Sequence, residues 1–363
     1  MIVDCHAHVF QNWKDACGHP SIEIHLKYLQ KVVTRPAAKT FRVRDGAEVQ
    51  PEMLFRPGDN TWGGLTDVAF RVGRYGQLQF TFEGDDYFVQ YMPLGMQEIE
   101  APPEFMVAQM IYAGIDHCIL QTGGGYGAMN DYNAFAQNQH PVRFSGLLQI
   151  EEPLADREEV LAEFDRAVHR LGLKGLYYAH DFSRYGYARN LDHVDFGPFW
   201  ERVASAKLPV FIELSSTPSY DRGSYIANLS ALGRVMARLP STRFLLVMGP
   251  PVAHFGMSGR WEFPDEVLTA YKRDNLQMEV MFPITWGGRW DYPYPEAQEL
   301  IRGMRDLFGA GKLVWGSDMP NVERFCTYRQ SLDYVRNYCS FLTAAEKERV
   351  LGANAAELIG LAG

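Results

Sequence analysis

The amino-acid sequence predicts an α/β fold, a (β/α)8 TIM barrel with a large insertion after the first strand. Eight short apolar segments recur along the 363 residues, and helical patterns separate most of them. Apolar strands that alternate with helices are expected to pair in parallel, with the helices outside. Eight such units favour a closed barrel over an open sheet. The length fits a single barrel domain with insertions, spanning residues 1–363.

The predicted elements follow from hydrophobic periodicity. In residues 156–170, for example, the apolar side chains recur on one helical face. The end of the chain, residues 343–361, is predicted to form a helix pair on the outside of the barrel. The predicted strands lie at residues 2–5, 115–121, 144–150, 173–178, 210–214, 244–248, 276–282 and 312–316.

Residues 10–101 differ in sequence pattern from the rest of the chain. They are predicted to form an inserted subdomain that acts as a lid or an interface. A helix is expected over residues 22–33. From Leu78 apolar and polar residues alternate, Gly84-Asp85 supplies a turn, and an aromatic return strand follows, which is typical of a β-hairpin. Antiparallel pieces directly after a parallel strand indicate an insertion.

The composition argues against several classes of protein. The formal net charge is −9 and Lys and Arg form no runs, which disfavours binding to nucleic acid or to an anionic membrane. The five cysteines are widely spread without a CxxC pair, which disfavours a disulfide scaffold or a zinc ribbon. No window approaches the roughly 18 apolar residues of a membrane span. We therefore expect a cytoplasmic protein.

Two histidines one residue apart, His6 and His8, follow the first predicted strand. Side chains of a strand alternate between two faces, so both imidazoles are expected to point into the barrel mouth, where such enzymes keep their reactive groups. Asp318 ends the last strand, which neighbours the first in a closed barrel, and Glu213 ends the fifth. We predict that one divalent ion, Zn²⁺ or Mn²⁺, is bound by His6, His8, Glu213 and Asp318.

These motifs resemble the amidohydrolase superfamily, specifically the amidohydrolase-2 branch with aminocarboxymuconate-semialdehyde decarboxylase and γ-resorcylate decarboxylase. The resemblance rests on VDCHAHVF and VWGSDMPN, with weaker matches at LKGLYY and LPVFIEL, and it leaves out residues 10–101. It implies a metal-dependent barrel that hydrolyses, hydrates or decarboxylates small carboxylic acids, often aromatic or unsaturated. It also implies that His6 and His8 are metal ligands and that Asp318 is a ligand or a base beside the metal.

Two positions depart from the pattern of that branch. The fifth strand usually ends in a histidine, and the Glu213 found here shifts the preference toward a harder ion such as Mn²⁺. The sixth strand usually ends in a histidine that transfers protons, a task that Met248 cannot perform. Two histidines elsewhere, His180 and His254, are candidate replacements.

The second predicted strand is followed by the loop GGGYG, residues 123–127. Its glycines would allow backbone N–H groups to approach a carboxylate. The spacings of known phosphate-binding loops are absent, however. A tight loop beneath the insertion is the favoured alternative.

Arg324 follows Asp318 by six residues and is a candidate for binding a substrate carboxylate. We therefore predict a metal-dependent hydrolase or carboxy-lyase that acts on a small aromatic or unsaturated carboxylic acid by decarboxylation or hydrolysis. Its catalytic residues are predicted to be Asp318, His180 and Arg324. The competing hypothesis is a non-catalytic or repurposed barrel with an eroded metal site. The resemblance also favours a homodimer.

Overall fold

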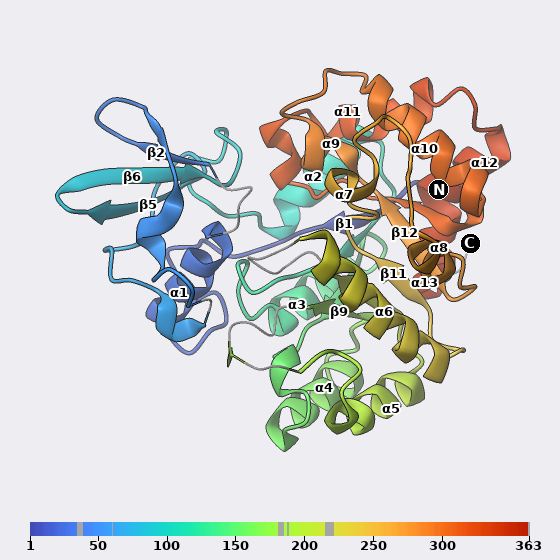
Figure 1. The fold of residues 1–363 in the computed structure, drawn as a ribbon, viewed down its shortest axis with the longest axis horizontal. Coiled ribbons are helices and arrows are strands. Elements are labelled where there is room, and N and C mark those ends of the chain that lie inside the picture. Colours follow the sequence, from blue (N-terminus) through green and yellow to red (C-terminus); the bar gives the residue numbers. More distant parts are fainter. Residues whose placement is uncertain (35–38, 60, 181–184, 187–188, 215–220, 362–363) are drawn as a thin grey trace.

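Eight parallel strands form one sheet in a computed structural model that describes residues 1–34, 39–59, 61–180, 185–186, 189–214 and 221–361. The strands follow one another in chain order around the barrel, with helices outside (Figure 1). The predicted barrel is confirmed, and each predicted segment overlaps a strand, with ends that differ by at most two residues; the first strand extends beyond its predicted end and includes His6. The strands are β1 (Val3–Ala7), β7 (His117–Leu120), β8 (Phe144–Leu148), β9 (Gly175–Ala179), β10 (Val210–Glu213), β11 (Phe244–Leu246), β12 (Leu276–Val280) and β13 (Leu313–Trp315).

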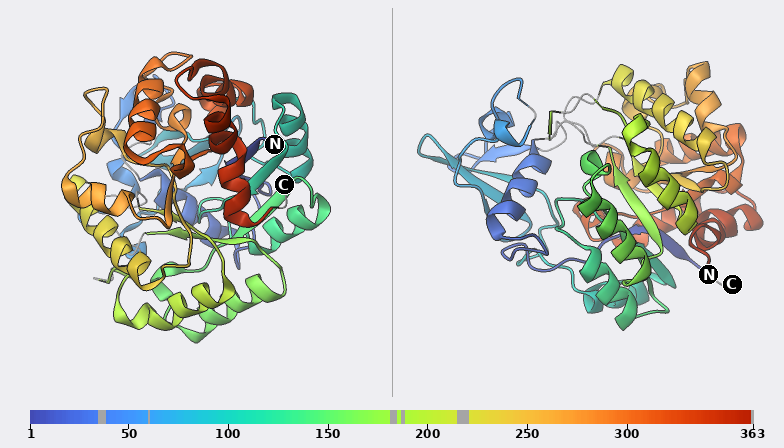
Figure 2. Two further views of the ribbon diagram at one scale, coloured as in Figure 1. Left: turned by 90° about the vertical axis from the view of Figure 1, so that its right-hand side faces the viewer. Right: turned by 90° about the horizontal axis from the view of Figure 1, so that it is seen from below.

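Helices surround the outer side of the barrel (Figure 2). Alternate strand residues face opposite ways, so Phe211 lies in the barrel interior and Ile212 in the outer layer. No helix among the described residues is long and apolar enough to cross a bilayer. The helices are α2 (Pro103–Ala113), α3 (Asn130–Gln139), α4 (Glu158–His169), α5 (Gly197–Ala206), α6 (Arg222–Arg238), α7 (Val252–Phe255), α8 (Asp265–Tyr271), α9 (Phe282–Trp286), α10 (Pro295–Phe308) and α11 (Tyr328–Asp333).

A buried aspartate joins the first strand to the segment that follows the last. Asp4 accepts hydrogen bonds from the backbone N–H of Ser317 (3.0 Å) and from its hydroxyl (2.5 Å). The hydroxyl of Tyr328 on α11 donates to the same carboxylate (2.7 Å). One residue further on, the N–H of Asp318 donates to the carbonyl of His6 (2.8 Å). These bonds bring the two ends of the sheet together at the mouth of the barrel.

The chain ends in one continuous helical segment, so the predicted helix pair is wrong. α12 (Ala344–Glu348) runs through a π-helical turn, Arg349–Ala353, directly into α13 (Asn354–Ile359). Gly352 does not break the helix. A Cβ there would stand 2.0 Å from the carbonyl oxygen of Met1, so glycine permits this close approach. Residues of α13 join the barrel-interior cluster at the end where both termini lie (Figure 1).

Residues 10–101, here called the insert, leave the barrel and return at one place. Phe10 and Ala101 donate backbone hydrogen bonds to each other, at 2.9 and 3.0 Å. Between them lie α1 (Ile22–Val33) and an antiparallel sheet with its own apolar core. The insert stands on the side of the barrel away from both termini (Figure 1). Its strands, in the order β3-β2-β6-β5-β4, are β2 (Thr40–Arg42), β3 (Glu48–Val49), β4 (Arg71–Val72), β5 (Gln77–Phe82) and β6 (Asp85–Gln90).

The predicted insert helix and hairpin are confirmed, with a shift of the hairpin turn by one residue. Phe82 pairs with Asp85, so the turn consists of Glu83 and Gly84 rather than Gly84 and Asp85. Both turn residues have positive φ, 48° and 83°. Two-residue hairpin loops favour this conformation because its twist matches that of the strands.

Candidate metal centre

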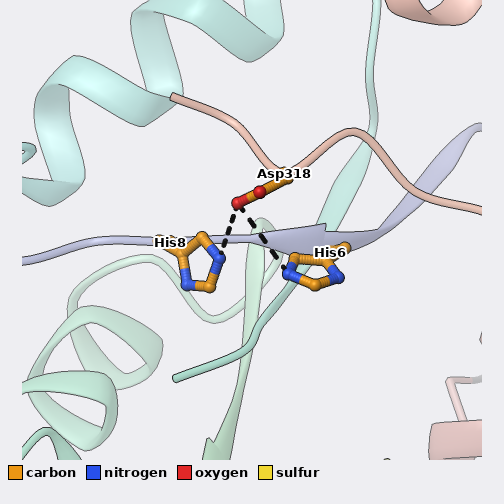
Figure 3. A group of neighbouring side chains, drawn as sticks. All are labelled: His6, His8 and Asp318. Carbon is orange, nitrogen blue, oxygen red and sulfur yellow. Dashed lines mark ion pairs between the residues drawn. The ribbon is translucent and has the colours of Figure 1, made fainter. Parts of the chain in front are cut away.

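His6, His8 and Asp318 form a buried group at the mouth of the barrel. Nε2 of His8 lies 3.0 Å from Oδ1 of Asp318, and Nε2 of His6 lies 3.9 Å from the same oxygen. Both imidazoles turn toward the carboxylate (Figure 3). The three ligand atoms lie within 4.8 Å of one another, and within the described residues no other such group of three or more was found.

A β-bulge in β1 directs both histidines into the barrel. The pairing with β7 slips by one residue between Asp4 and Ala7, so that Cys5 and His6 together face one residue of β7. Without the bulge, His6 would share the face of Asp4, which points outward. Because the bulge precedes Ala7, His6 and His8 share the inner face, as predicted.

The motif Gly316-Ser317-Asp318 accommodates this bulge. A Cβ on Gly316 would stand 2.8 Å from Cβ of His6 and 3.0 Å from Sγ of Cys5, so only glycine fits. Ser317 holds the carboxylate of Asp4. Asp318 has a φ of 64°, a left-handed conformation that few residues other than glycine adopt. Each residue of the motif therefore has its own part in the junction between the first and last strands.

A buried glutamate that the sequence reasoning missed, Glu279 on β12, holds His6 in place. Its Oε2 lies 3.0 Å from Nδ1 of His6 and accepts the backbone N–H of Met248 at 2.8 Å. Its Oε1 accepts the side-chain amide of Gln121 at 2.5 Å. A signal was present, because Glu279 is the one charged residue in the predicted strand LQMEVMF. A charge inside an apolar strand needs partners.

The ring nitrogens that face away from Asp318 are both engaged. Nδ1 of His6 contacts Glu279, and Nδ1 of His8 contacts the backbone carbonyl of Gln121 at 3.2 Å. Such contacts fix the tautomer and the orientation of a metal-binding histidine. Each Nε2 is therefore left to face Asp318 and any ion held there.

Met248 occupies the position where the resemblance implies a histidine. Its φ is 65° and that of Gly249 is 63°, so the chain makes a tight left-handed turn after β11. A Cβ on Gly249 would stand 2.3 Å from the carbonyl oxygen of Glu279. The turn places the backbone N–H of Met248 on Glu279 and contributes a main-chain donor rather than an imidazole.

The buried charges of the group shift its pKa values. Burial lowers the pKa of His6, but Glu279 and Asp318 outweigh burial and raise that pKa to about 9. Burial also lowers the pKa of His8, and there the effect of Asp318 is too small to compensate. Burial raises the pKa of Asp318, yet His8, His6 and Arg324 hold it below its ordinary value. A divalent cation would take the place of the proton on His6.

The structure brings Arg324 to the same mouth. Besides its effect on Asp318, its guanidinium lies 6.0 Å from the ring of Tyr91 in the insert and 5.0 Å from that of Phe325. Its Nε donates to the carbonyl of Asn321 at 3.4 Å. None of the ion pairs formed by the described residues includes Arg324. A half-buried cation of this kind is suited to binding an anion.

Glu213 lies outside the group of His6, His8 and Asp318. It ends β10, and its Oε2 accepts a hydrogen bond of 2.5 Å from the hydroxyl of Tyr177. Its part as a fourth metal ligand stays a prediction.

The two candidate replacement histidines also lie outside that group. Nε2 of His180 contacts Oδ1 of Asn190 at 2.8 Å, and Asn190 donates in turn to Asn228 on α6. His254 lies in α7 near the ring of Tyr225. A role in proton transfer for either histidine stays a prediction.

The GGGYG loop receives the insert, which confirms the alternative of a tight loop beneath it. A Cβ on Gly124 would stand 2.5 Å from the ring of Tyr28 on α1, so a larger residue would displace the helix. The tyrosine of the loop, Tyr126, stacks on His8 with ring centroids 4.0 Å apart. The sequence reasoning considered only the glycines of this loop and missed the tyrosine.

Two histidines of the insert lie together near this loop, His19 half-buried and His25 buried. The rings of His19 and His25 lie 5.6 Å apart at 30°. His25 is completely buried, and neither of its ring nitrogens has a hydrogen-bond partner. Burial and the neighbouring His19 lower the pKa of His25 to about 4. The folded protein therefore favours the neutral form of the His25 imidazole.

We expect the insert histidines to make the protein less stable in mild acid. The unfolded chain binds a proton on His25 near pH 6.5 and the folded chain only near pH 4, so stability falls as pH decreases between these values. The slope from this group is about 1.4 kcal/mol per pH unit. Urea unfolding at several pH values should show a shallower slope for His25→Phe. The exposed control His169→Phe should keep the wild-type slope, and equal slopes for all three proteins would contradict the expectation.

Comparisons with known proteins bear on the family. A family model described as amidohydrolase matches residues 3–361. Among curated proteins, L-fucono-1,5-lactonase from Burkholderia ambifaria is 30% identical over 138 residues, which are 35% of this chain and 45% of that protein. The match thus spans about half the length of that relative.

Solved structures share the fold. An apo structure from Agrobacterium tumefaciens has a TM-score of 0.52 at 15% identity and covers 99% of this chain and 96% of its own. A dihydroxybenzoic acid decarboxylase from Polaromonas sp. JS666 was solved with bound manganese and the inhibitor 2-nitroresorcinol. It has a TM-score of 0.51 at 18% identity, and the match covers 70% of this chain and 85% of that chain. At these identities the likeness concerns the fold alone. Because the family model matches nearly the whole chain, the protein belongs to the amidohydrolase family.

Proposed function

We propose that this protein is a metal-dependent hydrolase or carboxy-lyase that acts on a small aromatic or unsaturated carboxylic acid. One observation carries the proposal. A buried group of two imidazoles and a carboxylate shares its barrel mouth with Arg324, a cation that acts on Asp318 but is in none of the ion pairs formed by the described residues. The first suits a divalent ion, and the second suits the carboxylate of a substrate.

The donor atoms of this group fit a divalent ion. Zn²⁺ and Mn²⁺ both accept mixed imidazole and carboxylate ligands, and three protein ligands leave positions open for a substrate. The oriented Nε2 atoms of His6 and His8 support this assignment, and Glu213 remains a candidate fourth ligand. The manganese in the Polaromonas decarboxylase, a protein of the same fold, favours Mn²⁺.

The residues of the mouth have separate parts in the proposed reaction. When bound, the ion supplies Lewis-acid chemistry that polarises a substrate oxygen. Arg324 orients the substrate through its carboxylate. Asp318 moves a proton: in hydrolysis it accepts one from the attacking water, and in decarboxylation it delivers one to the carbon that releases CO₂.

A second candidate is the hydrolysis of a sugar lactone. The identity to L-fucono-1,5-lactonase favours it, although that match covers 35% of this chain. A lactone is a cyclic ester, and its hydrolysis needs the same polarised carbonyl and the same proton acceptor. Decarboxylation is distinguished from lactone hydrolysis by its product, because decarboxylation releases CO₂ and lactone hydrolysis releases a proton.

Metal analysis and a substrate panel test the proposal. Purified protein is stripped with a chelator, reloaded with Mn²⁺ or Zn²⁺, and assayed with hydroxybenzoates, unsaturated dicarboxylic acids and sugar lactones. We expect about one equivalent of bound metal and metal-dependent turnover of a carboxylic acid. Metal below about a tenth of an equivalent, unchanged in His6→Ala, would favour the non-catalytic alternative.

Three further sequence predictions are carried forward as proposals: a homodimer, a cytoplasmic location, and a lid or interface role for the insert. Light scattering of the purified protein tests the first. Limited proteolysis of the insert with and without a bound carboxylate tests the lid, because a lid becomes protected when it closes over a ligand.

A further inference from the structure

Tyr126 packs against His8, a member of the group of His6, His8 and Asp318, here called the metal-ligand group. Its ring lies nearly parallel to the imidazole of His8, with centroids 4.0 Å apart and planes at 17°. Phe10 and Trp13 contact the same ring, with centroids at 5.3 and 6.0 Å. Three aromatic neighbours therefore hold the ring of Tyr126, and through it the plane of His8.

The hydroxyl of Tyr126 lies within electrostatic range of the charged residues of the mouth. The charges of Asp318, Arg324 and Glu213 all act on it. The residue is half-buried, and none of the hydrogen bonds formed by the described residues includes its hydroxyl. A phenol in this position keeps a donor for a bound molecule.

Arg324 lies beside the insert, within electrostatic range of the same hydroxyl. The ring of Tyr91, which follows β6, lies under its guanidinium at 6.0 Å and also contacts Trp13 at 5.9 Å. A guanidinium and a phenol hydroxyl therefore both lie within electrostatic range of Asp318 at the mouth of the barrel. Two donors of this kind recognise the two oxygens of a carboxylate.

We propose that Tyr126 is a substrate-binding residue with two separable functions. Its ring keeps His8 in the orientation that binds the ion. Its hydroxyl donates, beside Arg324, a hydrogen bond to the carboxylate of the substrate. The second function rests on the proposed function above, whereas the first requires only the metal site.

Two substitutions separate these functions. Tyr126→Phe keeps the ring and removes the hydroxyl, and Tyr126→Ala removes both. We expect Tyr126→Phe to bind Mn²⁺ like the wild type and to bind the probe salicylate about 10- to 100-fold more weakly, the effect of one hydrogen bond to a charged group. Tyr126→Ala should in addition bind Mn²⁺ about 10-fold more weakly, because His8 loses its support.

The titrations use Mn²⁺ electron paramagnetic resonance for the metal and calorimetry of the Mn²⁺-loaded protein for salicylate. Tyr28→Phe is the matched control, because its hydroxyl donates to Glu151 at the insert junction (2.7 Å). It should leave both affinities unchanged. Circular dichroism establishes that each variant is folded, and for any turnover substrate KM should rise in Tyr126→Phe more than kcat falls.

Each outcome decides one part of the proposal. Unchanged salicylate affinity in Tyr126→Phe, or no salicylate binding to the wild type, overturns the role of the hydroxyl. Wild-type Mn²⁺ affinity in folded Tyr126→Ala overturns the role of the ring. If the wild type binds both ligands but converts no member of the substrate panel, the proposed function fails while the binding results still decide both roles of Tyr126.

Discussion

Replacement of Glu279 by alanine is expected to weaken Mn²⁺ binding by about 10- to 100-fold and to lower the free energy of unfolding by about 3 kcal/mol. The reason is that one buried carboxylate serves four donors, which are the ring of His6, the amide of Gln121, the N–H of Met248 and the thiol of Cys5. Water does not reach this place, since Glu279 is 1% exposed. Its removal takes an acceptor from each of these donors and frees the imidazole to rotate.

Metal titration and urea unfolding measure the two effects separately. Gln277→Ala on the same strand is the matched control, because its amide donates to Gly311 at the surface and not to the metal group. Glu279→Gln should show a smaller loss of stability, since it keeps the shape and one acceptor. Mn²⁺ affinity of Glu279→Ala within twofold of the control would refute a supporting role for this carboxylate.

Replacement of Asp318 by asparagine is expected to lower turnover of any substrate found in the panel by about 10³-fold or more. Asparagine has nearly the same shape, but it is neutral and cannot accept the proton that the proposed reaction moves. His6 and His8 remain, so metal is still bound, with lower affinity because the negative ligand is gone. The Asp318→Asn protein should therefore bind metal and have almost no turnover.

The measurement is turnover at a metal concentration that saturates the variant, with metal content determined on the same sample. Glu323→Gln is the control, because it neutralises a carboxylate on the same loop outside the metal-ligand group. It should keep wild-type turnover. An Asp318→Asn protein that holds metal and retains more than about a tenth of wild-type turnover would exclude Asp318 as the proton carrier.

Local patterns in the sequence were enough to predict the elements of the barrel. The strand segments were found because apolar runs alternate with helical periodicity, and α1 was found over the same residues that the structure assigns to it. The errors fell where tertiary contacts override a local pattern. Gly352 looks like a place for a helix to end, yet the helix continues through it because the start of the chain packs there.

The candidate metal centre was predictable in part for a topological reason. A closed barrel places its last strand beside its first, so His6, His8 and Asp318 were expected to meet, and the structure brings their ligand atoms within 4.8 Å. Glu213 ends the fifth strand, across the mouth. It was grouped with these residues because it also lies at the carboxyl end of a barrel strand. The structure gives its carboxylate a partner, Tyr177, that strand order does not reveal.

The sequence by itself determined the barrel, the place of the insertion and the three converging side chains His6, His8 and Asp318, because hydrophobic period and strand order are local or topological properties. Only the tertiary structure decided how the ligands are held. The bulge at Cys5 and His6, the support from Glu279 and the stacking of Tyr126 on His8 join residues that are far apart in the chain. Such contacts depend on side-chain direction and on the close packing of three segments, which no one-dimensional pattern records.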